Sequence, residues 1–395
     1  MDSVQNEITK IPVKLKNPVR IVTAASLFDG HDASINIMRR ILQDLGAEVI
    51  HLGHNRSVAE VVKAVLQEGA QGVCVSSYQG GHMEYFKYMK DLLDQSGAGY
   101  VKIFGGGGGV IVHEEKQELE AYGITQIFHP DDGRKMGLEG MIRYIVESCD
   151  FSLAEVSAKA PAGKQVFAND TVPSVEIGRA LTIIENKMED ADPSKLGLGT
   201  FLKKRKQTPV IGITGTGGAG KSSLIDELVQ RYMNFFPDSR IGVVCVDPSK
   251  RKTGGSLLGD RIRMNSLARP HVFMRSLASR GSGKEISQSL PLVLDFMKKL
   301  DFDIIIAETS GIGQGNTAVV ELSDVAMYVM TSEFGAQSQL EKIDMIDFAD
   351  VIAINKSDRR GASDAHRDVT KQYKRSRKIF DQETQVPVYL TQAAQ

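Results

Sequence analysis

Residues 209–233 read PVIGITGTGGAGKSSLIDELVQRYM. An apolar run leads into a glycine-rich turn, and an amphipathic segment with helical spacing follows at once. Positions 215–222 fit the pattern G-x-x-x-x-G-K-S, in which the backbone amides of the turn surround a phosphate at the start of a helix. The order of strand, loop and helix therefore predicts an α/β domain with a phosphate-binding loop. The alternative interpretation is a merely glycine-rich turn.

The residue types in this loop suit a bound nucleoside triphosphate. Lys221 offers a positive charge to the β- and γ-phosphate oxygens, where it would contribute to catalysis. The Ser222 hydroxyl can bind Mg²⁺. The other expected nucleotide contacts come from the turn and the start of the helix: Gly215, Gly217, Gly218, Ala219, Gly220 and Ser223.

Further apolar runs follow this loop at the spacing of an α/β sheet. They are RIGVVCV (240–246), FDIIIA (302–307), VAMYVM (325–330), VIAI (351–354) and VPVYL (386–390). Helical patterns separate them, which is typical of a parallel sheet. Residues 206–395 are therefore predicted to form one doubly wound domain.

The stretch NKSD, residues 355–358, stands directly after one of these runs. The Asp358 carboxylate could accept hydrogen bonds from N1–H and the exocyclic amine of guanine, which adenine does not present in that arrangement. Asn355 is expected to brace the loop, and Lys356 to pack along the base. Near the carboxyl end of the sequence, Ala393 or Ala394 could offer a backbone amide to the guanine carbonyl.

Three acids lie between these two motifs. Asp247 and Glu308 follow apolar runs, and Asp260 stands in a glycine-rich stretch that could close over the γ-phosphate. Carboxylates at the ends of parallel strands can reach Mg²⁺ directly or through water, so Ser222, Asp247, Asp260 and Glu308 are predicted to hold Mg²⁺. Glu308 and Asp260 are candidate catalytic residues beside Lys221. Solvated loop acids are the alternative, which suits Asp260 best.

An earlier series of apolar runs predicts a second parallel sheet. The runs are RIVTAAS (20–26), AEVIHL (47–52), QGVCVSS (71–77), VKIFG (101–105) and ITQIF (124–128), with helical patterns between them. The predicted divisions are an amino-terminal extension at 1–18, a first domain at 19–149 and a structured linker at 150–205. The linker includes a predicted helix around EIGRALTIIENKMED (176–190).

Polar and glycine-rich stretches end three of the predicted strands of the first domain. Asp29 and His31 follow the first strand, and Ser76 and Ser77 end the third. Gly105–Gly109 end the fourth and remove side chains from one wall, which suits a large ligand lying against the backbone. Taken alone, Asp29 and His31 could be loop and helix-capping residues, and the glycines a flexible loop.

The bulk composition excludes several classes of protein. The net charge of −1 over 395 residues gives no electrostatic case for nucleic acid or an anionic membrane. The three cysteines have no zinc or disulfide spacing, and we found no signal core or membrane span. A cytoplasmic protein is expected.

The second half resembles the metallochaperone branch of P-loop GTPases, most closely the G proteins that service adenosylcobalamin-dependent acyl-CoA mutases. The resemblance rests on GTGGAGKSS (215–223), VDPSKRKTGGSLLGDRIRM (246–264), AETSGIGQ (307–314) and NKSD (355–358). It implies slow GTP hydrolysis that a partner stimulates and that is coupled to cofactor delivery. Gln314 falls in the equivalent of a switch loop.

The first half resembles cobalamin-binding domains of the base-off, His-on class, which carry D-x-H-x-x-G, S-x-L and G-G motifs. The matching stretches are DGHDAS (29–34), SSY (76–78) and GGVI (108–111), with Ser34 and Tyr78 in place of the usual glycine and leucine. The resemblance implies that His31 binds cobalt and that Asp29 orients its ring. Ser76, Ser77, Gly108 and Gly109 would line the slot for the cofactor's nucleotide tail.

Together the two halves resemble the amino-terminal part of fused isobutyryl-CoA mutases. This implies adenosylcobalamin, GTP or GDP and Mg²⁺ as ligands, a GTPase that gates cofactor loading, and a homodimer. The mutase catalytic barrel is expected from another chain or a longer one. Two alternatives are a cobalamin-sensing regulator and a GTP-dependent metal-insertion chaperone.

Overall fold

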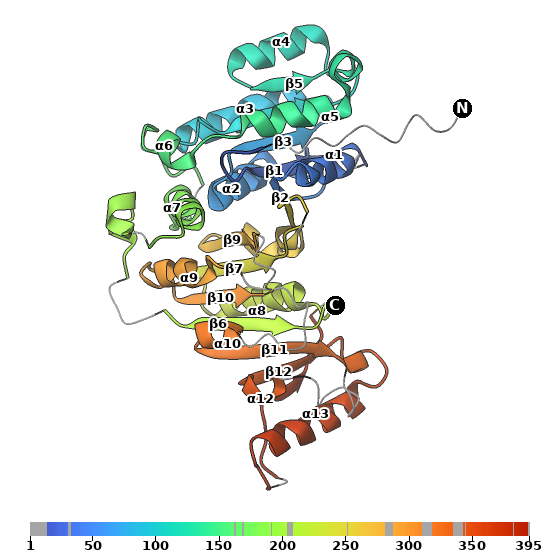
Figure 1. Cartoon of the computed structure of the whole chain (residues 1–395), viewed down its shortest axis with the longest axis vertical. Helices are drawn as coiled ribbons and strands as arrows, with labels where there is room; N and C mark the ends of the chain where they lie inside the picture. Colours follow the sequence, from blue (N-terminus) through green and yellow to red (C-terminus); the bar gives the residue numbers. More distant parts are fainter. Residues whose placement is uncertain are drawn as a thin grey trace, which may run out of the picture.

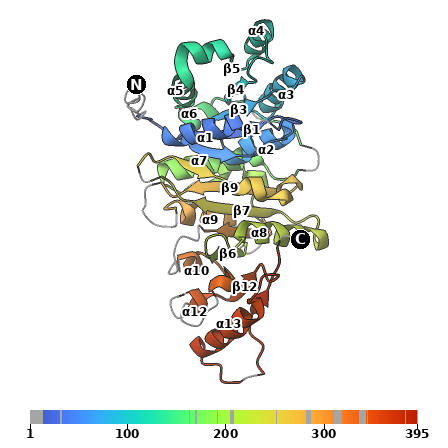
Figure 2. The same cartoon turned by 90° about the vertical axis from the view of Figure 1, so that its right-hand side faces the viewer.

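The computed structural model describes residues 14–30, 33–161, 163–167, 170–190, 192–203, 208–250, 252–280, 287–309, 318–334, 343, 345–381 and 383–393. Within them the chain forms two parallel sheets, one above the other in the elongated molecule of Figure 1, with helix α7 (Ser174–Lys187) at the level between them. The view turned by 90° shows the same succession (Figure 2). The two predicted α/β sheets are therefore confirmed.

The first sheet has the order β5-β4-β3-β1-β2-β8. Its strands are β1 (Arg20–Ala25), β2 (Glu48–His51), β3 (Gly72–Ser76), β4 (Lys102–Gly106), β5 (Gln126–Phe128) and β8 (Ser256–Leu258). The helices that follow its strands are α1 (Ala33–Asp44), α2 (Val58–Glu68), α3 (His82–Gln95), α4 (His113–Tyr122) and α5 (Pro130–Ser148), after which comes α6 (Leu153–Ser157).

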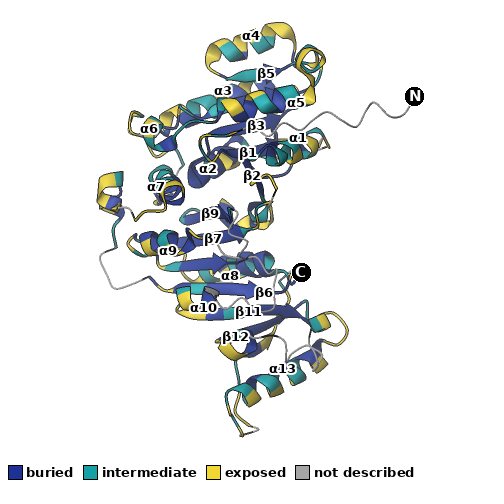
Figure 3. Cartoon of the chain, in the orientation of Figure 1, coloured by how far each residue is buried: buried dark blue, intermediate teal, exposed yellow. Residues whose placement is uncertain are grey.

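Helices cover both faces of this sheet. Neighbouring residues of a strand point to opposite faces, so each strand packs against helices on both sides. Ile21 of β1 packs in the cluster with α1 and α5, whereas Val22 packs with α2 and α3. Figure 3 shows the result, with buried strands inside and exposed residues on the outer helix faces. This arrangement explains why the predicted strands are almost continuously apolar.

The second sheet has the order β13-β12-β11-β6-β10-β7-β9. Its strands are β6 (Val210–Gly215), β7 (Ile241–Asp247), β9 (Val272–Ala278), β10 (Ile304–Glu308), β11 (Val325–Thr331), β12 (Val351–Asn355) and β13 (Val388–Leu390). Its helices are α8 (Lys221–Phe235), α9 (Leu290–Lys298), α10 (Ala318–Leu322), α12 (Met345–Phe348) and α13 (Ala362–Ser376), and short 3₁₀ helices include η3 (Asp260–Arg263) and η4 (Asn265–Ala268). The described helices include none long and apolar enough to cross a bilayer.

The sequence analysis did not predict two of the strands, β8 and β9. Strand β8 follows β7 in the chain, yet it pairs in parallel with β2 of the first sheet, where Glu48 lies opposite Ser256 and Ile50 opposite Leu258. The second half of the sequence therefore contributes an edge strand to the sheet of the first half. Sheet membership does not follow the predicted division of the sequence after residue 205.

Helix α7 confirms the helix predicted within residues 150–205, and it packs against both halves. Ile177 and Leu181 join the apolar cluster over β9 and α9. On the other side Gly178 meets the end of α2, where an added Cβ would lie 2.1 Å from the Leu66 carbonyl oxygen. Only a glycine permits this close approach of the two helix backbones.

A buried network of charges links the two sheets and α7. The Arg20 guanidinium on β1 lies 2.8 Å from Glu48, 3.1 Å from Glu68 and 3.0 Å from Glu185, which belong to β2, α2 and α7. All four side chains are at most 4 % exposed. Carboxylates from three elements thus share one buried cation, which is the pairing that a buried charge requires.

The second half contributes three arginines to the same network. Arg275 of β9 pairs with Glu185, Arg261 of η3 lies 3.1 Å from Glu68, and Arg280 lies 2.6 Å from Glu48. Burial raises the pKa of Glu48, but the positive charges of Arg280 and Arg20 outweigh it and lower that pKa to about 2. Glu48 is therefore ionised at neutral pH.

Candidate functional site

The glycine-rich loop lies between β6 and α8, at the carboxyl edge of the second sheet. Gly215 has φ of 153°, and an added Cβ there would lie 1.9 Å from the Val329 carbonyl oxygen of β11. Gly218 and Gly220 have φ of 73° and 87°, which favours glycine. The loop can therefore turn tightly and present the first backbone amides of α8 to an anion.

The predicted phosphate-loop residues lie together at this helix start. Lys221 is buried, and its Nζ donates to the carbonyl oxygens of Gly215 (3.4 Å) and Thr216 (3.3 Å). Gly217, Gly218, Ala219 and Gly220 form the turn, and Ser223 follows in the first turn of α8. The Lys221 ammonium group is thus held over the loop by two long hydrogen bonds to carbonyl oxygens. A bound phosphate would replace these two acceptors.

The NKSD segment lies beside the phosphate loop. Asn355, at the end of β12, donates from Nδ2 to the Ala219 carbonyl oxygen at 2.8 Å and accepts from the Ala393 amide at 3.3 Å. Lys356 donates to the Gly218 carbonyl oxygen at 2.7 Å, and Asp358 is exposed in the following turn. Ala393 is half-buried at the same place, whereas Ala394 lies outside the described residues.

Carboxylates gather around the loop serine. The Ser222 hydroxyl lies 3.0 Å from Asp260 Oδ1 and 3.1 Å from Glu308 Oε1. The Asp247 carboxylate accepts from the Gly259 amide at 3.3 Å, one residue before Asp260. The structure therefore brings together the predicted metal ligands, drawn from α8, β7, η3 and β10.

This gathering of negative groups perturbs their titration. Burial, assisted by the negative charge of Asp260, raises the pKa of Glu308 to about 8 and that of Asp247 to about 8. A divalent cation bound here would offset the repulsion between these carboxylates. Hydroxyl and carboxylate oxygens are the ligands that Mg²⁺ prefers, so the donor set fits this ion. Cys245 lies 3.6 Å from Glu308, and burial raises its pKa further above the ordinary range, which keeps it a neutral thiol.

A slot opens at the carboxyl edge of the first sheet. It has a volume of about 150 Å³ and lies between the end of β4 and the starts of α1 and α5. The polar group of interest is Ser76, whose hydroxyl is buried and has no hydrogen-bond partner among the described residues. An orphaned buried hydroxyl at the wall of a slot fits a ligand with a hydrogen-bonding atom.

The two predicted serines differ in their surroundings. The Ser77 hydroxyl accepts from Ser26 at 2.9 Å, so it is engaged within the protein, whereas Ser76 lines the slot. Asp29 is buried and accepts from the Tyr78 amide at 2.7 Å. His31 lies outside the described residues.

The five glycines after β4 serve different purposes. An added Cβ at Gly105 would lie 2.4 Å from Phe86, and one at Gly107 would lie 1.9 Å from the Ser77 carbonyl oxygen. Gly108, with φ of 57°, lines the slot beside Tyr78, whereas Gly109 is exposed and is not part of its lining. The run is therefore tightly packed at its start and accessible at its end.

Sequence reasoning missed the apolar wall of this slot. Phe104, Phe128, Met141 and Ile145 form it. Their spacing in the sequence indicates only core positions, and β4, β5 and α5 must come together before the slot exists.

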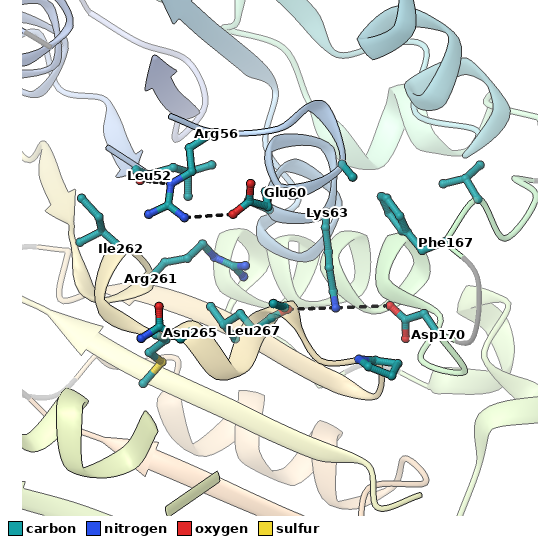
Figure 4. Close-up of a pocket in the computed structure, with 16 residues that line it drawn as sticks. Leu52, Arg56, Glu60, Lys63, Phe167, Asp170, Arg261, Ile262, Asn265 and Leu267 are labelled. Atoms are coloured by element: carbon teal, nitrogen blue, oxygen red, sulfur yellow. Dashed lines mark hydrogen bonds and ion pairs between the residues drawn. The ribbon is translucent and has the colours of Figure 1, made fainter. Parts of the chain in front are cut away.

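A second cavity lies at the junction of the two halves, and Figure 4 shows its lining. It has a volume of about 500 Å³ and is lined by α2, η3, η4 and residues 166–170 where described. Lys63 of α2 reaches the carbonyl oxygens of Leu267 (3.1 Å) and Arg269 (3.0 Å), and lies 3.8 Å from Asp170. Burial lowers the pKa of Lys63, although the charge of Asp170 opposes this.

Residue 260 faces the phosphate loop, whereas its neighbour faces the other half. Arg261 donates to Glu68 (3.1 Å) and Gln67 (3.0 Å) of α2 and to the Met274 carbonyl oxygen (2.8 Å). Because Asp260 and Arg261 are consecutive in η3, one short helix contacts both the phosphate loop and α2.

Residues 177–395, more than half of the chain, match the family model described as methylmalonyl-CoA mutase-associated GTPase MeaB. The chain belongs to this family. Residues 19–131 match the model of the B12 binding domain, so this member of the MeaB family carries a flavodoxin-like B12-binding domain before its P-loop GTPase domain.

Curated relatives contain both domains. The fused isobutyryl-CoA mutase of Geobacillus kaustophilus is 56% identical over 390 residues, which cover 96% of this chain and 35% of that protein. The fused isobutyryl-CoA mutase of Cupriavidus metallidurans is 56% identical over 384 residues, which cover 96% of this chain and 34% of that protein. The chain thus spans about a third of the length of these relatives and is homologous to their amino-terminal third.

Proposed function

We propose that this chain binds adenosylcobalamin and hydrolyses GTP as a module of an isobutyryl-CoA-type acyl-CoA mutase, and that its GTPase gates cofactor loading. One observation carries the proposal. A phosphate loop with Ser222 held between Asp260 and Glu308 stands on the same chain as a slot with the orphaned Ser76 hydroxyl. Both lie at carboxyl edges of parallel sheets, where such folds bind ligands.

In the nucleotide site, the residues have separate tasks. Lys221 and the loop amides would hold the β- and γ-phosphates, and Ser222, Asp247, Asp260 and Glu308 would hold Mg²⁺ directly or through water. When bound, Mg²⁺ supplies positive charge that offsets the charge developing on the transferred phosphoryl group. Asp358 would select guanine, and Asn355, which bonds the Ala219 and Ala393 backbone, would brace the loop beside the base.

In the first domain, the slot would receive the nucleotide tail of cobalamin, with Ser76 close to a ring nitrogen and Gly108 allowing close approach of the backbone. His31 would bind cobalt, and Asp29 would orient that imidazole. When bound, the cofactor would supply the radical chemistry that the rearrangement needs. Residues of this chain would bind and shield it, whereas rearrangement of the acyl-CoA needs a mutase barrel from a longer chain or another one.

Gating has a physical route in η3. Asp260 would sense the metal and nucleotide, and Arg261 contacts α2 of the cobalamin-binding domain. A change in the loop that follows the loss of the γ-phosphate would therefore reach the first domain through two consecutive residues. We further propose that the module works as a homodimer in the cytoplasm. Its net charge of −1 gives nucleic acids and anionic membranes no electrostatic advantage as partners.

The first test is a titration of adenosylcobalamin with the chain, followed by absorption spectroscopy. We expect a base-off spectrum with histidine coordination in the wild type and its loss in His31→Ala. The matched control is His54→Ala, which removes an exposed histidine of the same domain. GTP hydrolysis is measured in parallel, with Lys221→Ala as the inactive variant. Absence of both cobalamin binding and GTP hydrolysis in the wild type would refute the proposal.

A further inference from the structure

Two helices of the first domain begin side by side, and each brings a histidine. His113 is the first residue of α4, and His129 is the N-cap of α5. Their ring centroids are 4.0 Å apart with an angle of 38° between the rings. Asp131, in the first turn of α5, completes the cluster.

The three side chains converge on one point. Asp131 Oδ2 lies 3.3 Å from His113 Nε2 and 3.2 Å from His129 Nδ1. The ligand atoms of all three residues lie within 4.8 Å of one another. In a tetrahedral zinc site with ligand bonds of about 2.0–2.1 Å, ligand atoms stand about 3.3 Å apart. The two measured separations already have the spacing of such a site.

The surroundings hold the carboxylate in place. Arg134 donates to the other oxygen of Asp131, Oδ1, at 2.9 Å, which leaves Oδ2 for the histidines. Nδ1 of His129 accepts from the Asp131 amide at 3.3 Å, a long hydrogen bond that a metal ion at Nδ1 would replace. The nearby Lys116 ammonium is occupied by Asp132 at 3.0 Å and Glu120 at 3.2 Å, so it is engaged away from the cluster.

The donor set selects a class of ion. Two imidazoles and one carboxylate suit Zn²⁺ and related divalent transition metals, whereas Mg²⁺ prefers oxygen ligands only. The side chains of His113 and Asp131 are 58% and 39% exposed, so an ion can enter from solvent and a water can fill the fourth position.

We propose that His113, His129 and Asp131 form a binding site for a zinc-class divalent cation. This site shares no residue with the predicted ligands of Mg²⁺ and cobalt. A bound ion ties the start of α4 to the corner between β5 and α5. His129 also lines the slot of the first domain, so the ion stiffens one rim of that slot.

The test is a zinc titration of the chelator-treated full chain against a chromophoric competitor, with Mg²⁺ and GDP saturating so that the nucleotide site is filled. We expect one Zn²⁺ per chain, and at least about tenfold weaker binding in His113→Ala and in Asp131→Asn. His129→Asn is the third variant, because asparagine retains an N-cap acceptor while removing the imidazole. His54→Ala, which removes an exposed histidine outside the cluster, should bind as tightly as the wild type.

Cobalt(II) gives a second readout, since tetrahedral coordination that includes two histidines produces visible absorption bands much stronger, and at longer wavelength, than the weak band of hexahydrated cobalt. Circular dichroism verifies that each variant is folded. Equal zinc affinity in the wild type and His113→Ala, or no zinc binding by the wild type, would overturn the proposal. Neither result depends on whether the chain binds cobalamin or hydrolyses GTP.

Discussion

The variant Glu68→Gln removes one buried charge and should weaken the contact that holds the two halves of the chain together. The Glu68 carboxylate accepts four hydrogen bonds. Oε1 accepts from Arg261 (3.1 Å) and Ser276 Oγ (2.9 Å), and Oε2 accepts from Arg20 (3.1 Å) and the Ser276 amide (3.0 Å). The amide of glutamine has a single oxygen, so its NH₂ group must face one of these donor pairs.

The loss is large because the site is buried. The Glu68 side chain is fully buried and the Arg20 side chain is 2% exposed, so water cannot replace the lost acceptor. Breaking a buried ion pair by removing one partner costs about 3–5 kcal/mol. A domain has a stability of about 5–15 kcal/mol, so the expected loss is a substantial part of the total. Because Arg20 and Arg261 belong to different halves, the loss falls on the contact between them.

The assay is urea denaturation followed by far-ultraviolet circular dichroism, since the chain has no tryptophan. We expect an earlier first transition in Glu68→Gln and two separable transitions. The control is Glu227→Gln on α8, whose partner Arg231 has a side chain that is 71% exposed. Exposed ion pairs contribute little to stability, so this control should match the wild type. If both variants unfold at the same urea concentration, the buried network does not hold the halves together.

Four further predictions test other parts of the structure. The pKa of Glu48 is lowered to about 2 in the folded protein, so its contribution to stability is present above the ordinary pKa of 4.5 and is lost as pH falls toward 2. In acid titrations of unfolding, Glu48→Gln should therefore flatten this part of the profile, and an unchanged slope would contradict the assignment. Asp358→Asn should weaken GTP binding and improve xanthosine triphosphate binding, because an amide can donate to the extra carbonyl of xanthine; equal losses for both nucleotides in a fluorescence competition assay would argue against base recognition by Asp358. Gly215→Ala should lower the melting temperature and abolish nucleotide binding, since its Cβ would lie 1.9 Å from the Val329 carbonyl oxygen, and calorimetry with unchanged melting would disprove this. Ser76→Ala should weaken cobalamin binding several-fold with little change in stability, as its hydroxyl has no partner among the described residues; an unaltered affinity in the spectroscopic titration would remove it from the site.

Local patterns were sufficient for much of the fold. The phosphate loop was predictable because strand, turn and helix are contiguous, and β1 and β6 were predictable because both of their faces are buried. Strand β9 was missed because Arg275 and Ser276 interrupt its apolar run. These polar residues are buried only because Glu185 and Glu68, far away in the sequence, pair with them.

The candidate sites were also only partly predictable, because some of their contacts join residues that are distant in the sequence. Asp247 and Glu308 could be grouped from the sequence, because strands of one parallel sheet end at one edge, whereas Asp260 was a candidate only from its glycine-rich surroundings. The different surroundings of Ser76 and Ser77 could not, since Ser76 is the last residue of β3 and Ser77 lies just beyond it, and only the folded sheet decides which of them lines the slot. The short β8 carries no pattern of its own, and its partner β2 lies some two hundred positions earlier in the chain.

Strand β8 has a consequence for the history of such chains. Residues 256–258 cover the backbone of β2, so a gene that encoded only the first domain would produce a sheet with a bare edge. Bare edges recruit other strands and lead to aggregation. Once a loop of the GTPase had become the outer strand of its neighbour, splitting the gene again would yield two defective fragments. The first domain would aggregate through its uncovered edge, and the GTPase would carry an unpaired strand. Selection against both fragments would keep the two domains on a single polypeptide.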